Sequence, residues 1–296
     1  MPATPPQQHE IMVNGVRLCY FERGVASPDR PTLVFIHATG FHGRVWDRLA
    51  EAFPEHHSLA LELRGHGRSE NVPIDHWRDV AIDICEFVTA LGVTNAIGIG
   101  HSMGAHCLVD AAAHCDAFAS LLLLDPTIAA PESYADDTSP FPDGAHPATR
   151  RRNHFDSPEE MIERLLPKSS FALYEPRILD DYCRYGLVPA PEGGFQLACP
   201  PEMEATVYMS ARSNGGVYDS IRKLDIPVFI VRAKERSAEL GGPDFSSSPT
   251  WPGLVNEFKN AQELHLQDCS HFIPMQKPDL VIGLIREQVD QWEPAS

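Results

Sequence analysis

The stretch NAIGIGHSMGAH (residues 95–106) decides the fold. It starts as an apolar run, passes through the pattern G-H-S-M-G and continues into an alanine-rich segment that predicts a helix. A sharp turn from strand to helix strains the backbone of its central serine, and a glycine on either side removes side chains that would collide there. The pattern therefore predicts that Ser102 stands clear of a sheet as a nucleophile. The alternative is a serine that only caps the helix.

Short apolar runs on both sides of this stretch predict the other strands of a sheet. They are TLVFIHA (32–38), HSLALEL (57–63), SLLLLD (120–125), IPVFIVRA (226–233) and ELHLQD (263–268), preceded by a hairpin around Asn14-Gly15. Runs that are apolar on both faces suit a parallel sheet covered by helices. We predict an α/β fold with a mostly parallel eight-stranded sheet.

The alternation of strands and helices is interrupted after the sixth predicted strand. Residues 126–222 are rich in proline, with two short predicted helices (157–166 and 176–186) and an apparent loop (188–202). The simplest organisation is a mainly helical cap over residues 126–222, inserted into a core formed by residues 1–125 and 223–296.

His271 is the predicted general base for Ser102. A serine hydroxyl is protonated at neutral pH, so it needs a neighbouring base, and the base needs a group that fixes its tautomer. His271 lies in a short loop between the last predicted strand and the final predicted helix. His265, inside that strand, and His101, beside Ser102, are expected to pack or to make a local hydrogen bond. The alternative for His271 is an ordinary surface-loop histidine.

Four motifs together resemble the α/β-hydrolase fold superfamily, in the branch with a G-H-S-M-G elbow and an inserted cap. Besides the elbow, HATG (37–40) resembles its oxyanion loop, LRGHGRS (63–69) the segment after the fourth strand, and DCSHFIPMQKPDLV (268–281) its histidine loop. The resemblance implies a serine hydrolase with an oxyanion hole made by backbone amides.

By this resemblance the amides of Met103 and Thr39 would hold the oxyanion. Ala38 is the alternative donor, because it stands where the family usually has glycine.

The acid of the triad is predicted at Asp125. The family usually carries it after the seventh strand, but that segment, VRAKERSAEL (231–240), has no aspartate and offers only Glu235 and Glu239. Asp125 ends the sixth predicted strand, which resembles the arrangement in haloalkane dehalogenases and some lactone hydrolases. Glu235 remains the alternative acid, and Asp125 would then only cap the turn into Pro126.

The predicted reaction is hydrolysis of a carboxylic ester or lactone through an acyl-enzyme, with no metal or organic cofactor. Carbon–carbon bond hydrolysis and cofactor-free perhydrolysis use the same triad, and a non-catalytic ligand receptor is an alternative from another class. Phe41, Trp46 and Ile273 are expected near a substrate pocket. Aromatic residues of the cap could add to its lining, although most of these side chains are expected to be core: Tyr134, Phe141, Phe155, Phe171 and Tyr174.

Composition limits the possible partners. A net charge of −17 disfavours extended contact with nucleic acid or anionic membrane, and no window approaches the roughly 18 apolar residues of a membrane span. The seven cysteines are scattered and never spaced as C-x-x-C, which favours reduced thiols and a cytoplasmic location. The expected partner is a small-molecule substrate, and the oligomeric state is left open.

Overall fold

An eight-stranded sheet forms the centre of the protein in the computed structural model, which describes residues 4–134, 146–168, 170–236 and 245–294. Its strands are β1 (Gln7–Val13), β2 (Val16–Arg23), β3 (Leu33–Ile36), β4 (Ser58–Glu62), β5 (Ala96–His101), β6 (Phe118–Leu124), β10 (Val228–Arg232) and β11 (Ala261–His265). The spatial order is β1-β2-β4-β3-β5-β6-β10-β11, and only the pairs β1–β2 and β2–β4 are antiparallel. The predicted α/β fold and its mostly parallel sheet are confirmed.

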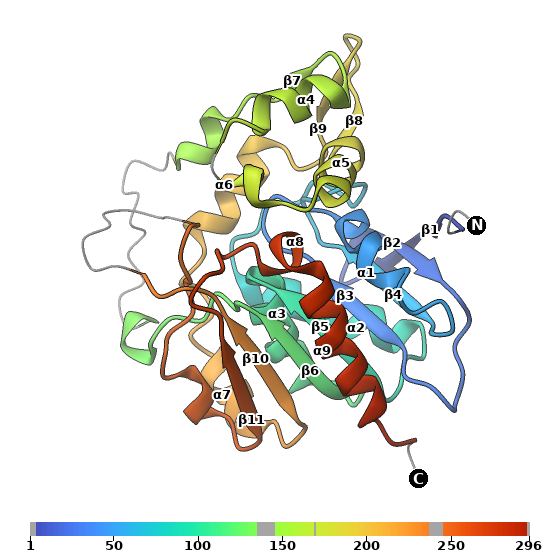
Figure 1. Ribbon diagram of the computed structural model, residues 1–296, viewed down its shortest axis with the longest axis vertical. Helices are drawn as coiled ribbons and strands as arrows, with labels where there is room; N and C mark the ends of the chain where they lie inside the picture. Colours follow the sequence, from blue (N-terminus) through green and yellow to red (C-terminus); the bar gives the residue numbers. More distant parts are fainter. Residues whose placement is uncertain (1–3, 135–145, 169, 237–244, 295–296) are drawn as a thin grey trace.

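Helices cover both faces of the sheet (Figure 1). One layer holds α2 (Trp77–Ala90), α3 (Met103–Ala112) and α7 (Val217–Lys223), and the other holds η1 (Gly43–Trp46), α1 (Asp47–Ala50), α8 (Ile273–Gln276) and α9 (Pro278–Asp290). In β3, Val34 packs into the first layer and Phe35 into the second, because successive side chains of a strand point to opposite faces. Burial on both faces explains why the strands read as continuous apolar runs.

The chain between β6 and β10 builds a further layer over one edge of the sheet (Figure 1, top). Its elements are η3 (Pro147–Arg150), β7 (His154–Phe155), α4 (Pro158–Leu165), η4 (Phe171–Leu173), α5 (Pro176–Tyr185), β8 (Leu187–Pro189), β9 (Phe195–Leu197) and α6 (Pro201–Met209). Before it, η2 (Pro131–Tyr134) lies beside the sheet, where Tyr134 contacts Tyr218 of α7. The domain limits at 126 and 222 stay a prediction. Residue 222 lies inside α7, whose Ile221 packs with α3 beside the sheet.

The loop predicted over residues 188–202 is wrong in part, because it contains strand structure. β8 and β9 pair in a hairpin and β7 adds a third antiparallel strand. Gly193 and Gly194, with φ of 93° and 68°, form the turn, a conformation that glycine adopts at little cost. Each strand has only two or three residues, too few to show an apolar alternation in the sequence.

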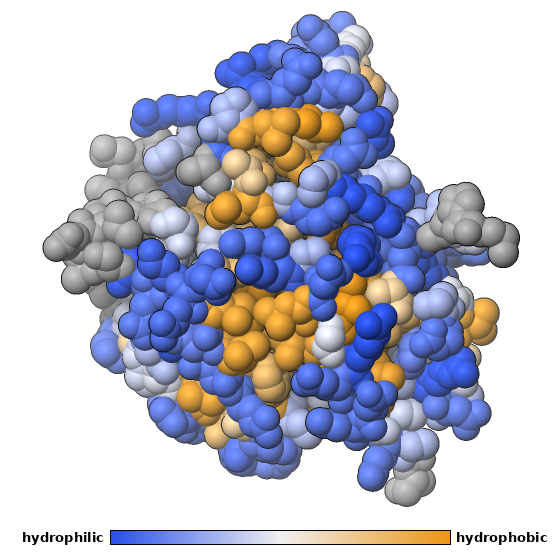
Figure 2. Space-filling view, viewed as in Figure 1, coloured by the Kyte–Doolittle hydropathy of each residue, from blue (hydrophilic) through white to orange (hydrophobic). Residues whose placement is uncertain are grey.

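Apolar surface gathers on the insertion and beside α8 and α9 on the face shown in Figure 2. Leu166 and Leu173 of the insertion are 48% and 45% exposed. A hollow of about 330 Å³ lies where the two parts meet, lined by Leu173 and Tyr174 on one side and by Pro278 and Leu280 on the other. Among the helices described here, none has both the length and the apolar content needed to cross a membrane.

Asp181 on α5 is buried where the insertion contacts the core. Its Oδ2 lies 3.8 Å from Arg177 Nε, while Asp47 of α1 adds a second negative charge nearby. Burial first, and the charge of Asp47 second, raise the pKa of Asp181 to about 7. The folded protein therefore holds a proton between about pH 4 and pH 7 that the unfolded chain has released.

We expect the folded state to lose stability as pH rises from about 4 to 7, and Asp181→Asn to remove this loss. Since asparagine stays neutral, the variant should exceed the wild type at pH 8 by on the order of 2 kcal/mol and match it near pH 4.5. Urea unfolding at both pH values measures the difference. A variant that is less stable than the wild type at pH 8 would contradict the expectation.

Candidate active site

The fold brings together Ser102, Asp125 and His271, three residues that lie far apart in the sequence. Ser102 follows β5 and Asp125 follows β6, and these neighbouring parallel strands end at the same edge of the sheet. His271 lies in the loop between β11 and α8. Its Nε2 is 2.9 Å from Ser102 Oγ, and its Nδ1 is 2.6 Å from Asp125 Oδ2. All three are buried, with exposed fractions of 7%, 0% and 2% in sequence order.

The hydrogen bonds fix which nitrogen of His271 carries the proton. A carboxylate can only accept, so Nδ1–H donates to Asp125. Nε2 then keeps its lone pair, which accepts from the hydroxyl of Ser102. This is the arrangement in which an imidazole can remove the proton of a serine as it attacks.

The backbone turns sharply at Ser102, where φ is 58° and ψ is −123°. A Cβ atom added to Gly100 would lie 2.6 Å from Ala105 Cα, and one added to Gly104 would lie 2.3 Å from the carbonyl oxygen of His37. Both glycines are therefore required by close approach of backbone to backbone, as the elbow pattern predicts. The turn leaves Ser102 at the amino end of α3.

We expect Gly104→Ala to destabilise the protein by about 3 kcal/mol, because neither backbone segment can move away from the added methyl group. Gly283→Ala is the matched control, since its Cβ meets nothing within 4 Å inside α9. The control should gain about 0.5–1 kcal/mol from the higher helix propensity of alanine. Thermal unfolding of both variants tests this, and equal melting temperatures would contradict it.

Asp125 lies in a dense set of hydrogen bonds. Its Oδ1 accepts from the Ala233 amide at 2.9 Å, from Ser248 Oγ at 2.5 Å and from Thr250 Oγ1 at 3.2 Å. The backbone of Asp125 has φ of 48°, and its amide donates to Val231. Donors to one oxygen hold the carboxylate so that the other oxygen faces His271. The sequence interpretation missed Ser248 and Thr250, for which the hydroxyl-rich run SSSPT (246–250) was the available signal.

The alternative acid, Glu235, does not reach His271. Its side chain is 59% exposed and its Oε1 accepts from Arg232 Nη1 at 3.2 Å. Glu239 lies outside the described residues. In the described part of the chain, the carboxylate that faces His271 is that of Asp125.

Two further residues contact Ser102 or His271, and the sequence did not assign them to the site. Thr127 Oγ1 lies 3.1 Å from Ser102 Oγ, so it offers the hydroxyl a second partner. His101 Nε2 lies 2.9 Å from the carbonyl oxygen of His271. Burial first, and the neighbouring His271 second, lower the pKa of His101 well below its usual value, so this ring stays neutral and donates to the loop that carries His271.

The HATG loop after β3 is held by the imidazole of His37. Nδ1 lies 2.8 Å from the Ala38 carbonyl, and Nε2 accepts from the Leu63 amide at 3.0 Å. Burial, followed by His66, lowers the pKa of His37, and a neutral ring is what this bond pattern requires. The loop lies against α3, since the His37 carbonyl borders Gly104.

The predicted pocket residues have different surroundings. Phe41 is 5% exposed, and its ring lies 6.2 Å from that of His101 and 6.0 Å from that of Phe272. Trp46 is fully buried against Phe35 of β3 in the hydrophobic core, and its role at a pocket stays a prediction. Ile273 is also fully buried in the same core cluster.

The aromatic residues of the insertion named as possible pocket residues have different surroundings. Tyr174 packs 5.3 Å from Phe272, between ring centroids, and 5.2 Å from Phe171. Tyr134 instead contacts His106 and Tyr218. Phe141 lies outside the described residues. Phe245, which the sequence interpretation did not single out, stacks on His271 at 5.8 Å and is 38% exposed.

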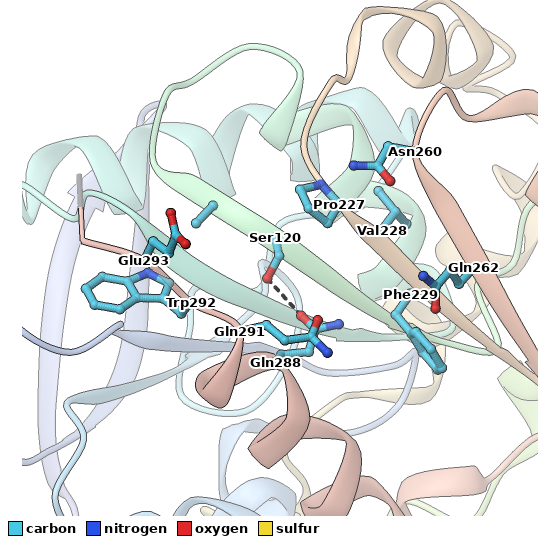
Figure 3. Close-up of a pocket in the computed structure, with 11 residues that line it drawn as sticks. Ser120, Pro227, Val228, Phe229, Asn260, Gln262, Gln288, Gln291, Trp292 and Glu293 are labelled. Atoms are coloured by element: carbon cyan, nitrogen blue, oxygen red, sulfur yellow. Dashed lines mark hydrogen bonds between the residues drawn. The ribbon is translucent and has the colours of Figure 1, made fainter. Parts of the chain in front are cut away.

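A separate hollow of about 340 Å³ lies where β6 and β10 begin (Figure 3). The strand ends that carry Ser102 and Asp125 are on the other side of the sheet's length. The hollow is lined by Ser120 near the start of β6, by Phe229 of β10 and by Gln288 of α9, and Ser120 Oγ donates to Gln288 Oε1 at 2.8 Å. None of the predicted site residues lines it. Within the described ranges, no three His, Cys, Asp or Glu side chains are grouped so that they could hold a metal ion.

A family model described as Alpha/beta hydrolase family matches residues 33–284. The chain belongs to this alpha/beta hydrolase family. The match runs from β3 into α9 and so includes both parts of the sheet and the insertion between them. The family accounts for the sheet order, and it makes a small-molecule substrate the expected partner.

Similar proteins include a lipase and an enol-lactonase. The lipase LipV of Mycobacterium tuberculosis is 28% identical over 267 residues, which are 88% of this chain and 95% of that protein. An E-2-(acetamidomethylene)succinate hydrolase structure has a TM-score of 0.76 at 20% identity and covers 96% of this chain and 99% of its own. The enol-lactonase of Burkholderia xenovorans LB400 has a TM-score of 0.68 at 18% identity, with coverages of 94% and 98%. At these identities the two structures share the alpha/beta hydrolase fold with this chain.

Proposed function

We propose that the protein is a serine hydrolase that cleaves a carboxylic ester or lactone through an acyl-enzyme intermediate. Ser102 is the nucleophile, His271 the general base and Asp125 the acid that orients it. The observation that carries the proposal is the continuous hydrogen-bonded series from Asp125 Oδ2 through both nitrogens of His271 to Ser102 Oγ.

The reaction follows from this geometry. Ser102 Oγ attacks the substrate carbonyl carbon while its proton passes to His271 Nε2, and Asp125 stabilises the imidazolium that forms. His271 then gives the proton to the leaving alkoxide, which departs as an alcohol and leaves an acyl group on Ser102. A water molecule, deprotonated by His271, releases the acid and restores the enzyme.

The oxyanion formed at each tetrahedral stage needs hydrogen-bond donors. We propose the amides of Met103, the first residue of α3, and of Thr39 in the HATG loop, with Ala38 as the alternative to Thr39. The first amides of a helix have no partner inside the helix and add its positive dipole end. His37, which holds the loop from both ring nitrogens, is a positioning residue for the second donor.

The insertion is proposed to act as a cap over this site. Phe245 and Phe272 lie beside His271, and Tyr174 of the insertion packs on Phe272, so aromatic rings border the triad from both parts of the chain. Such a lining suits an apolar acyl or alcohol group. The lipase and lactonase among the similar proteins are consistent with an ester or lactone as substrate.

The test is a search for the acyl-enzyme. The protein is mixed with p-nitrophenyl esters of graded chain length and with a panel of lactones, quenched in acid within seconds and digested for mass spectrometry. We expect the acyl mass on the peptide that carries Ser102, together with turnover of at least one ester or lactone. Hydrolysis without an adduct on any serine, or an adduct on a different serine, would overturn the assignment.

A further inference from the structure

A partly buried ion pair of the insertion lies directly against the HATG loop. Arg151, which follows η3, donates from Nη1 to Glu204 Oε2 on α6 and from Nη2 to Tyr182 Oη on α5, the latter at 3.3 Å. A Cβ atom on Gly40 would lie 3.2 Å from Glu204 Cδ and 3.3 Å from Arg151 Nη1. Because Gly40 follows Thr39, the ion pair lies next to the proposed oxyanion donor.

A second series of contacts leads to the same ion pair from His271. The Phe245 ring stacks on His271, the Tyr208 ring lies 6.2 Å from Phe245, and Tyr208 Oη donates to Glu204 Oε1 at 3.4 Å. The side chain of Arg151 is 29% exposed although that of Glu204 is only 7% exposed. The guanidinium is therefore more accessible to a ligand than the carboxylate with which it pairs.

The charges of this group already compensate one another. Arg151 supplies one positive charge and Glu204 one negative charge, and both oxygens of Glu204 have partners. Burial raises the pKa of Tyr182 and of Tyr208, so both phenols stay neutral. A guanidinium has five N–H donors, of which two serve Glu204 and Tyr182 in the described structure, so donors remain for a ligand.

We propose that this Arg151 wall, made of Arg151, Glu204, Tyr182 and Tyr208, selects substrates with a neutral polar group over substrates with a second carboxylate. The inference rests on the proposed ester or lactone hydrolysis and adds the class of substrate. A hydroxyl or carboxamide can accept from Arg151 and add no charge. A carboxylate would lie beside the shielded carboxylate of Glu204, and like charges repel strongly where water is excluded.

The negative net charge of the chain also disfavours substrates that carry a carboxylate. At −17 it lowers the concentration of anions near the molecule. The aromatic rings of Phe41, Phe245 and Phe272 next to the triad favour an aryl group as the carrier of the neutral substituent. The expected substrate is therefore an ester whose acyl or alcohol part carries an aromatic ring with a hydroxyl or carboxamide.

Matched esters test the selection. Methyl phenylacetates with hydrogen, carboxamide or carboxylate at the para position vary the acyl side, and benzyl acetates with the same substituents vary the alcohol side. We expect kcat/KM for the carboxamide to exceed that for the carboxylate by about tenfold or more in at least one series, and the carboxylate to be preferred in neither. An active enzyme that prefers the carboxylate, or that does not discriminate in either series, overturns the inference alone. Absence of turnover for every ester would instead refute the proposed function.

Glu204→Gln separates recognition from a merely structural role. It leaves Arg151 uncompensated, so the ratio of carboxylate to carboxamide kcat/KM should rise by about tenfold or more over the wild type. A structural effect would lower the rates of all esters and leave this ratio unchanged. Glu159→Gln is the matched control, because Glu159 pairs with Arg184 at 3.1 Å on the exposed side of the insertion and should not alter the ratio.

A double variant keeps the test decisive if Glu204→Gln does not fold. Arg151→Gln with Glu204→Gln leaves no unpaired buried charge, and it removes the guanidinium donors. We expect it to lose the preference for the carboxamide over the unsubstituted ester. A double variant that keeps the full preference would overturn the assignment of recognition to the Arg151 wall.

Discussion

Ser102→Ala is expected to lower kcat by about 10⁴- to 10⁶-fold while leaving the fold intact. The methyl group of alanine fits wherever the serine fits, so only the nucleophile and its bonds to His271 and Thr127 are removed. Loss of a nucleophile costs about as much as loss of the whole triad, because the residues act as a unit. The measurement is kcat for the best ester of the panel.

A fluorophosphonate probe gives an independent reading of the same variant. The wild type should be labelled on Ser102, and Ser102→Ala should not be labelled. Ser270→Ala is a matched control, since Ser270 lies next to His271 but its Oγ donates to Gln276 at 2.8 Å. It should keep the label. An unlabelled wild type, or equal labelling of Ser102→Ala, would refute the serine hydrolase proposal.

Asp125→Asn is expected to lower kcat by about 10⁴-fold. An amide at this position can donate as well as accept, so His271 can take the wrong tautomer, in which Nε2 carries the proton and cannot serve Ser102. The three donors to Oδ1 should keep the side chain in place, so the loss would concern the tautomer more than the geometry. Steady-state kinetics with circular dichroism to confirm folding measure this effect.

Glu235→Gln is the matched control for Asp125→Asn. Its exposed carboxylate pairs with Arg232, and the substitution should change kcat less than about twofold, as surface substitutions away from a site usually do little. If the ranking were reversed, the acid would have to be reassigned from the end of β6 to the segment after β10.

The sequence allowed Ser102 and His271 to be chosen because their signals are local. The elbow needs two glycines within five residues, and the contacts at Gly100 and Gly104 give that requirement its steric cause. Asp125 was chosen because the segment after β10, where the family usually carries the acid, has no aspartate, and because Asp125 directly follows β6. The hydrogen-bonded series from Asp125 to Ser102 is the geometry that those choices require.

Other parts of the site could not be found in this way, because they depend on residues that are distant in the sequence. Ser248 and Thr250 are more than 120 positions from Asp125, and nothing in the run SSSPT identifies the carboxylate that it serves. Arg151 and Glu204 are 53 positions apart and meet only through the insertion. Trp46 is a different case, because it is near the HATG loop in sequence, yet its ring lies in the core.

The pairing of β6 with β10 has a consequence for the order of folding. The backbone and side chain of Asp125 bond to the Val231 carbonyl and the Ala233 amide, which the ribosome adds about 130 residues after Ser102. The parallel register between Leu124 and Val231 closes a long loop, and such closures are slow steps in folding. A nascent chain that has not yet made β10 therefore contains the serine but neither the support of its acid nor its base. Reactivity of Ser102 toward a fluorophosphonate should accordingly appear late during refolding, after β10 has paired with β6.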